Sequence, residues 1–76
     1  MIKEKIADII KEVRRREGLS QAAMGKAADI TQAGIARLEA GNEMPRLDLL
    51  ARLLAGAGYE LRLVASKKST QIETTL

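Results

Sequence analysis

Three residues near the middle of the chain have the types and the spacing needed to make hydrogen bonds and apolar contacts from one side of a helix. Gln32, Ala33 and Arg37 lie in the stretch "ITQAGIARLEAG", residues 30–41. At this spacing their side chains protrude on one side of an α-helix. A Gln amide can bond bidentately to adenine, an Arg guanidinium to guanine, and an Ala methyl can pack on the methyl group of thymine. The pattern therefore predicts a helix that contacts base edges.

The helix that carries these side chains is the second of two short helical segments. The first segment, "QAAMGKAA" (residues 21–28), follows Ser20, a residue type that caps helix N-termini. Asp29 interrupts the pattern, Thr31 can cap the next helix, and Gly41 ends it. Two short helices joined by about three turn residues form a helix-turn-helix, whose second helix lies in the DNA major groove in well-studied cases.

The same segment has apolar and small residues where two crossing helices need them. Gly25 and Ala28 are small at positions where the helices must approach closely. The positions that should face inward are Met24, Ile30, Ile35 and Leu38. We therefore interpret Met24 as a core residue and not as a ligand.

The residues from Leu19 to Leu54 resemble the Cro/cI-type, or XRE-type, family of DNA-binding repressors. The motifs that carry the resemblance are Leu-Ser-Gln at 19–21, Thr-Gln-x-x-Ile at 31–35 and Leu-Glu-x-Gly at 38–41. The resemblance implies a mainly α fold, a lambda-repressor-like bundle of four to five short helices that contains the helix-turn-helix.

The family pattern also implies roles for single residues. Gln21 touches a phosphate and supports Gln32, which faces base edges together with Ala33, with Arg37 one turn further along. Glu39 resembles a buried or semi-buried structural acid, and the backbone around residues 41 and 42 lies against a phosphate. The DNA-binding residues predicted in this way are Gln21, Thr31, Gln32, Ala33, Arg37, Gly41 and Asn42.

The chain departs from the family pattern at three positions. Asp29 stands where the turn usually has Gly, and Asp is one of the few other residues that tolerate the left-handed conformation. Gly34 replaces a position often held by Ser or Thr, at a cost of about 1 kcal/mol of helix propensity. Ala40 stands where many members have a polar residue near a phosphate. These departures bear on DNA affinity more than on the fold.

Helices are also expected on both sides of this motif. The first runs from the N-terminus to Gly18 and has apolar residues at three- and four-residue spacings. Arg14, Arg15 and Arg16 at its end could clamp a phosphate, but basic residues there also suit the helix dipole, which is the interpretation we prefer. The last helix, "RLDLLARLLAGAG", follows the loop "GNEMP" and closes with two glycines.

The segment "YELRLV", residues 59–64, has the alternating pattern of a half-buried strand. A lone strand has no partner in a helical domain, so we expect it to pair with its own copy across a two-fold axis through Tyr59, Leu61 and Leu63. The alternative is an extended segment lying on its own helices. We expect residues 1–65 to form the domain with its dimerisation strand, and residues 66–76 to form a flexible tail whose Lys67 and Lys68 solvate it.

Composition limits the chemistry that the chain can perform. Among 76 residues there is no Cys and no His, and Tyr59 is the only aromatic residue. The usual general base and the usual metal ligands are therefore missing, so we expect no enzyme activity and no cofactor. The net charge of +3 favours anionic partners mildly. No apolar run approaches a membrane span, and we expect a cytoplasmic protein.

These observations predict a dimeric, sequence-specific transcriptional repressor that binds double-stranded DNA at a palindromic operator. The short length and C-terminal strand also resemble antitoxins of the HipB or HigA kind, in which a small DNA-binding protein neutralises a toxin and represses its own operon. A protein-interaction module that mainly neutralises a toxin, a phage repressor, and the controller of a restriction system remain open alternatives.

Overall fold

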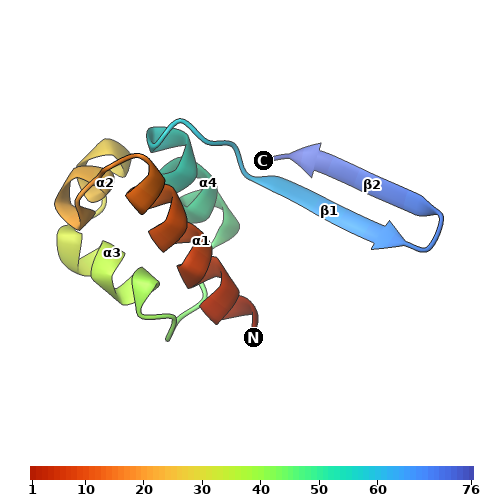
Figure 1. Ribbon diagram of the computed structural model, residues 1–76, viewed down its shortest axis with the longest axis horizontal. Helices are drawn as coiled ribbons and strands as arrows, with labels where there is room; N and C mark the ends of the chain where they lie inside the picture. Colours follow the sequence, from red (N-terminus) through yellow and green to blue (C-terminus); the bar gives the residue numbers. More distant parts are fainter.

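The computed structural model describes all 76 residues as a bundle of four helices followed by a β-hairpin (Figure 1). The helices are α1 (Ile2–Arg16), α2 (Gln21–Ala28), α3 (Gln32–Glu39) and α4 (Leu47–Gly56), and the strands are β1 (Arg62–Lys67) and β2 (Thr70–Thr75). The prediction of a mainly α fold with a helix-turn-helix is confirmed. None of the helices combines the length and the hydrophobicity that crossing a membrane requires.

The core lies where the four helices meet, and it is aliphatic as the composition requires. Side chains of α2 pack against both α3 and α4, and α1 closes the bundle against α3. Nine buried side chains form one cluster: Ile10, Val13, Met24, Ala28, Ile35, Leu38, Leu50, Leu53 and Leu54. Three of the four residues predicted to face inward belong to it, and the fourth, Ile30, is partly buried against it. This cluster holds α3 on the surface of the bundle.

Every helix is followed by a residue in the left-handed conformation, which turns the chain sharply into the next element. These residues are Gly18, Asp29, Gly41 and Gly58. After α1, the Leu19 N–H donates to the Arg14 carbonyl and the Gly18 N–H to the Arg15 carbonyl, which together form a Schellman ending. Asp29, with φ 58° and ψ 46°, is the one residue of the four with a side chain to accommodate.

The turn between α2 and α3 passes so close to α2 that position 25 of the helix must be a glycine. A Cβ atom on Gly25 would lie 2.3 Å from the Ile30 carbonyl oxygen and 3.2 Å from Cγ1 of Ile35. A hydrogen bond closes this turn: the Ile30 N–H donates to the Gly25 carbonyl at 2.8 Å. The prediction that small residues lie where these helices meet is confirmed.

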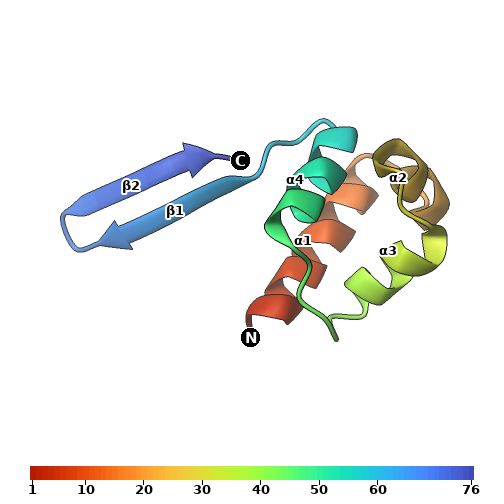
Figure 2. The ribbon, with the colours of Figure 1, turned by 180° about the vertical axis from the view of Figure 1, so that it is seen from behind.

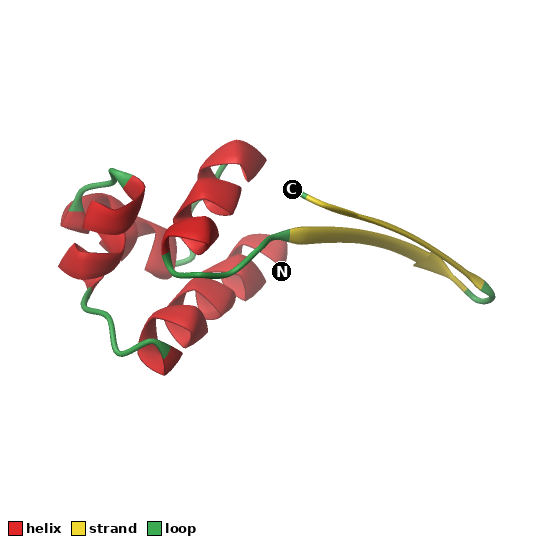
Figure 3. Ribbon diagram, turned by 90° about the horizontal axis from the view of Figure 1, so that it is seen from above, coloured by secondary structure: helices red, strands yellow, loops and turns green.

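The C-terminal segment differs from the expectation of one strand and a flexible tail. The first strand begins at Arg62 and not at Tyr59, and residues 70–75 form a second strand that pairs with it antiparallel. β1 therefore has a partner within its own chain. The hairpin projects from the bundle along the long axis of the molecule (Figures 1 and 3). The whole molecule measures 42 × 24 × 21 Å.

The physical reason for the difference lies in β2 and in the turn before it. The segment "TQIETT" has only one aliphatic residue, but its Thr and Ile side chains are β-branched and favour extended backbone. The connection through Lys68 and Ser69 contains no Gly, Asn or Pro, and neither residue has positive φ, so it lacks the usual signal of a two-residue hairpin.

The left-handed Asp29 leads to a stability prediction. Replacing Asp29 with Gly should raise the free energy of unfolding by about 0.5–1 kcal/mol, because Gly adopts this conformation without steric cost. Replacing Asp29 with Ala should lower it, because Ala has the same Cβ atom and no local hydrogen bonding. Chemical denaturation of the three proteins measures both changes. An Ala variant more stable than the Gly variant would contradict this account of the turn.

Candidate nucleic-acid interface

The outer side of α3 presents the residues that the sequence predicts to contact bases. Gln32, Ala33 and Arg37 are all exposed, while Ile35 and Leu38 on the opposite side of the helix are buried. The structure therefore brings these three predicted side chains to one solvent-facing side. In Figures 1 and 2, α3 lies at the end of the molecule opposite the hairpin.

The N-terminus of α3 is built by a side-chain cap and a fitted glycine. The Thr31 hydroxyl accepts a hydrogen bond from the Gly34 N–H at 3.0 Å. A Cβ atom at position 34 would lie 2.9 Å from Cγ2 of Ile30 and 3.2 Å from that same hydroxyl. Glycine has a low helix propensity, but a larger residue at position 34 would crowd the Thr31 cap. Thr31 therefore has a structural role as the cap of α3. It is also exposed, next to Gln32 in the candidate interface.

A partly buried ion pair fixes α3 against the rest of the bundle. Nε of Arg14 donates to one carboxylate oxygen of Glu39 at 2.6 Å, and Nη2 donates to the other at 3.0 Å. Nη1 of Arg14 also donates to the Leu19 carbonyl at 3.2 Å, and Nε2 of Gln21 donates to Glu39 at 3.3 Å. Groups from α1, α2 and α3 thus meet at one carboxylate. The interpretation of Glu39 as a buried structural acid is confirmed, with 6 % of its side chain exposed.

The hydrogen bonds around Glu39 outweigh the cost of burying it. Burial alone would raise the pKa of the Glu39 carboxyl, but the hydrogen bonds from Arg14 and Gln21, together with the nearby positive charge, lower its pKa below the ordinary value. The carboxylate is therefore charged at neutral pH and stabilises the fold in that form.

The structure gives two sets of predicted residues partners within the chain. Gln21 donates a hydrogen bond to Glu39 at the end of α3, and its predicted contact with a phosphate stays a prediction. Arg14 is part of the same network, whereas Arg15 and Arg16 pair with Glu12 on the surface of α1. The sequence carried no signal for the Arg14–Glu39 contact, because the two residues lie 25 positions apart.

The segment after α3 forms the border of the interface. Gly41 is buried against α1, and its N–H donates to the Leu38 carbonyl at 3.2 Å, so that amide is used within the chain. Asn42 is exposed and its N–H makes no backbone hydrogen bond. Arg37 and Asn42 line one shallow surface hollow, which Ala40 and Glu43 complete.

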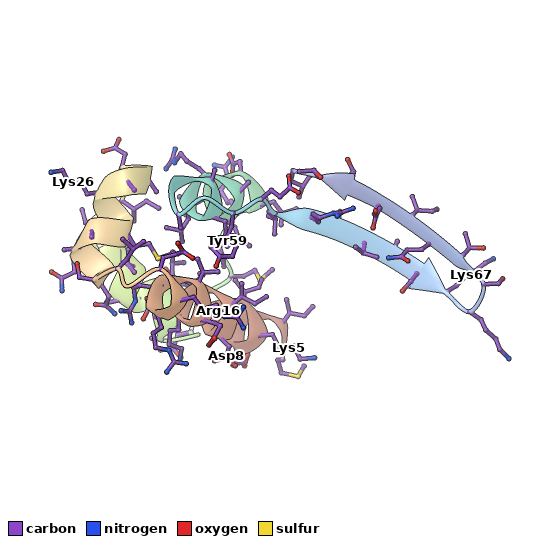
Figure 4. All side chains as sticks on the ribbon, turned by 45° about the horizontal axis from the view of Figure 1, so that its top comes forward. Lys5, Asp8, Arg16, Lys26, Tyr59 and Lys67 are labelled. Carbon is purple, nitrogen blue, oxygen red and sulfur yellow. The ribbon has the colours of Figure 1, made fainter.

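The three residues predicted for dimerisation separate into two environments. Tyr59 and Leu61 precede β1 and pack against the helical core of their own chain. The Tyr59 hydroxyl donates to Glu17 at 2.9 Å, and this hydrogen bond raises the pKa of the phenol. Figure 4 shows Tyr59 beside α1, close to Arg16, with Lys67 at the far end of the hairpin. Of the three, only Leu63 lies within a strand, and it is 52 % exposed.

The comparison with protein families agrees with this geometry. A family model described as "Helix-turn-helix domain" matches residues 6–66. The chain belongs to this helix-turn-helix domain family. It is therefore a DNA-binding regulator, and domains of this family are typically non-enzymatic. No curated protein and no solved structure gives a significant match.

The Arg14–Glu39 ion pair of this helix-turn-helix protein leads to a pH-dependent prediction. Replacing Glu39 with Gln should lower the free energy of unfolding at neutral pH by about 1–3 kcal/mol, because Arg14 loses its charged partner. The folded-state pKa of Glu39 is below its ordinary value of 4.5. The advantage of the wild-type protein should therefore be complete above about pH 5 and shrink as the pH falls further.

Chemical denaturation at a series of pH values measures this difference. Glu43→Gln is the matched control, because Glu43 is exposed in the loop after α3 and makes no salt bridge. A difference between wild type and Glu39→Gln that stayed constant from pH 7 to about pH 3 would contradict the role given to this carboxylate.

Proposed function

We propose that the protein is a sequence-specific transcriptional repressor that binds a palindromic operator as a homodimer. The observation that carries the proposal is the outward side of α3, where Gln32 and Arg37 are exposed while the helix is held from behind by the core and the Arg14–Glu39 pair. A rigidly held helix presents its side chains at a defined position, which specific base contacts need. Repression follows from occupancy of the operator alone.

The chemistry of this surface favours a short, defined set of base contacts. Gln32 and Arg37 are the α3 side chains that can hydrogen-bond to bases, with adenine and guanine as their preferred partners. The other exposed α3 residues, Ala33 and Ala36, present methyl groups that can pack on thymine. Backbone amides and basic side chains such as Lys26, exposed on α2, would contact phosphates without selecting a sequence.

A single α3 helix contacts only a few base pairs, so a homodimer would give the specificity that an operator requires. Two α3 helices related by a two-fold axis would contact half-sites separated by one helical turn of about 34 Å, or by a multiple of it, on one side of the duplex. The hairpin supports this proposal because it projects away from α3 and is exposed along its full length. Self-association there leaves the DNA-contacting surface free.

A second role, as an antitoxin that neutralises a toxin protein, is supported by apolar residues that the bundle leaves uncovered. On α1, Ile2 is 65 % exposed and Ile9 is 53 % exposed. Exposed aliphatic residues of this kind suit contact with another protein. Co-purification with the product of the neighbouring gene tests the role, and Ile9→Glu should abolish retention without changing DNA binding. Absence of any retained product would remove the antitoxin role.

The base contacts can be tested on an operator selected from random DNA. Gln32→Ala and Arg37→Ala should each weaken operator binding by about 1–3 kcal/mol per half-site, with little effect on binding to a scrambled duplex. Arg52→Ala is the matched control, because Arg52 is an exposed arginine on α4 that pairs with no acid. Titrations at one fixed salt concentration measure the changes. If both α3 variants bound the operator as the wild type does, α3 would not be the recognition helix.

A further inference from the structure

The hairpin has only two short strands and lacks the support of a third strand or a covering helix. An isolated two-stranded hairpin is marginal in water, and every residue of β1 and β2 is exposed. One face combines Leu63, Ala65 and Ile72, which lie together because Ala65 is opposite Ile72 and side chains alternate along a strand. Ile72 is 70 % exposed. The hairpin therefore has an uncovered apolar face as well as two unpaired edges.

The hydrogen-bonding pattern shows which backbone groups lie on those edges. The Leu76 N–H donates to the Leu61 carbonyl at 2.7 Å, so these opposite residues form a hydrogen-bonded pair. Because such pairs alternate in an antiparallel ladder, the backbone groups of every second residue point outward. On β1 these residues are Arg62, Val64 and Ser66, and on β2 they are Gln71, Glu73 and Thr75.

Charge distinguishes the two edges. β1 carries Arg62 and Lys67, and Lys68 follows in the turn, so two copies of this edge would bring cations together. Positive side chains on an edge strand are a known protection against pairing. The one charged residue of β2 is Glu73, and it already forms a salt bridge with Arg62 of β1. β2 is therefore a charge-poor edge of β-branched residues with no Pro and no Lys to block pairing.

We infer that a second copy of the chain pairs antiparallel along the β2 edge, giving a four-stranded sheet in the order β1, β2, β2, β1. The inference rests on the proposed homodimer and specifies its surface. The favoured register places Ile72 opposite Ile72 of the partner subunit at the two-fold axis. Gln71 then lies opposite Glu73 of the partner subunit in a hydrogen-bonded pair, and Thr70 lies opposite Thr74 of the partner subunit.

Three of the shifted registers are less favourable. A slip by one residue would place the apolar residues of the two copies on opposite faces of the sheet. A slip by two residues in one direction places Glu73 opposite Glu73 of the partner subunit, which repels. In the chosen register, the two-fold axis is perpendicular to the sheet, so the apolar residues of both hairpins form one continuous face.

The register can be tested by disulfide cross-linking, because the chain has no cysteine of its own. In Ile72→Cys the two introduced residues face each other across a non-hydrogen-bonded pair, with Cα atoms about 4.5 Å apart, within disulfide range. Leu63→Cys is the matched control on the same face. In the inferred sheet it lies three strand spacings from its copy, at least about 14 Å, which a disulfide cannot span.

Mild oxidation followed by non-reducing electrophoresis should therefore give a dimer for Ile72→Cys and a monomer for Leu63→Cys. Cross-linking of Leu63→Cys alone would show that β1 edges pair, and would overturn the inference. Cross-linking of both variants, or of neither, would overturn it as well.

A charge pair gives a second test that does not depend on oxidation. Gln71→Lys should tighten the dimer and Gln71→Glu should weaken it, because each lies opposite Glu73 of the partner subunit at two symmetric places. The expected change in the dissociation constant is between about 2-fold and about 30-fold. Ser66→Lys and Ser66→Glu, on the β1 edge, should leave it unchanged. Sedimentation analysis measures all four, and a response at Ser66 without one at Gln71 would overturn the inference.

Failure of this inference can be separated from failure of the proposed function. Binding to a duplex with a single half-site measures the α3 interface without a dimer. Gln32→Ala and Arg37→Ala should weaken that binding and leave the Ile72→Cys cross-link unchanged. If half-site binding is normal and the cross-link is absent, only the β2 pairing falls. If the cross-link forms and half-site binding is unselective, the proposed base contacts fall instead.

Discussion

The contact between Arg14 and Glu39 is the interaction on which the proposed DNA-binding surface depends. It joins the end of α1 to the end of α3, and Gln21 adds the start of α2 to the same carboxylate. A charged pair in this position loses hydration, and its energetic balance is favourable only because both carboxylate oxygens have donors. Since the donors come from α1 and α2, these directed hydrogen bonds tie the end of α3 to both helices. The aliphatic core alone would hold α3 less uniquely.

The short length of the helices places a second demand on the chain. α2 and α3 have eight residues each, too few to be stable alone, so their ends and crossings carry much of the structure. Ser20 and Thr31 cap the N-termini with their hydroxyls. Gly25 allows the turn to approach the core, and left-handed residues end each helix. Caps and turn residues therefore stabilise these short helices, whereas longer helices are stabilised by their many internal hydrogen bonds.

This dependence on local chemistry explains how much of the fold could be predicted. The caps, the glycines and the helical periodicity are all visible in the sequence, so α2 was predicted with its observed bounds, 21–28. The outward set on α3 followed from spacing, because the side of a helix opposite its buried residues must be exposed. The partner of Glu39 did not follow, because a contact across 25 positions leaves no pattern in one sequence. β2 was missed because Thr and Gln provide extended backbone without the alternation of apolar residues that marks a buried strand.

The separation of the hairpin from the helix-turn-helix has a consequence for how such proteins can diversify. The residues proposed to contact DNA lie on α3, whereas the residues on the free edge of β2 lie in the hairpin at the other end of the chain. A substitution on one of these surfaces does not disturb the packing of the other. With the proposed base contacts on α3 and the proposed dimer contact on β2, two copies could after gene duplication acquire different operators while still associating, or lose mutual recognition while keeping the same operator. Regulatory circuits of related proteins in one cell could therefore become insulated from one another through very few substitutions.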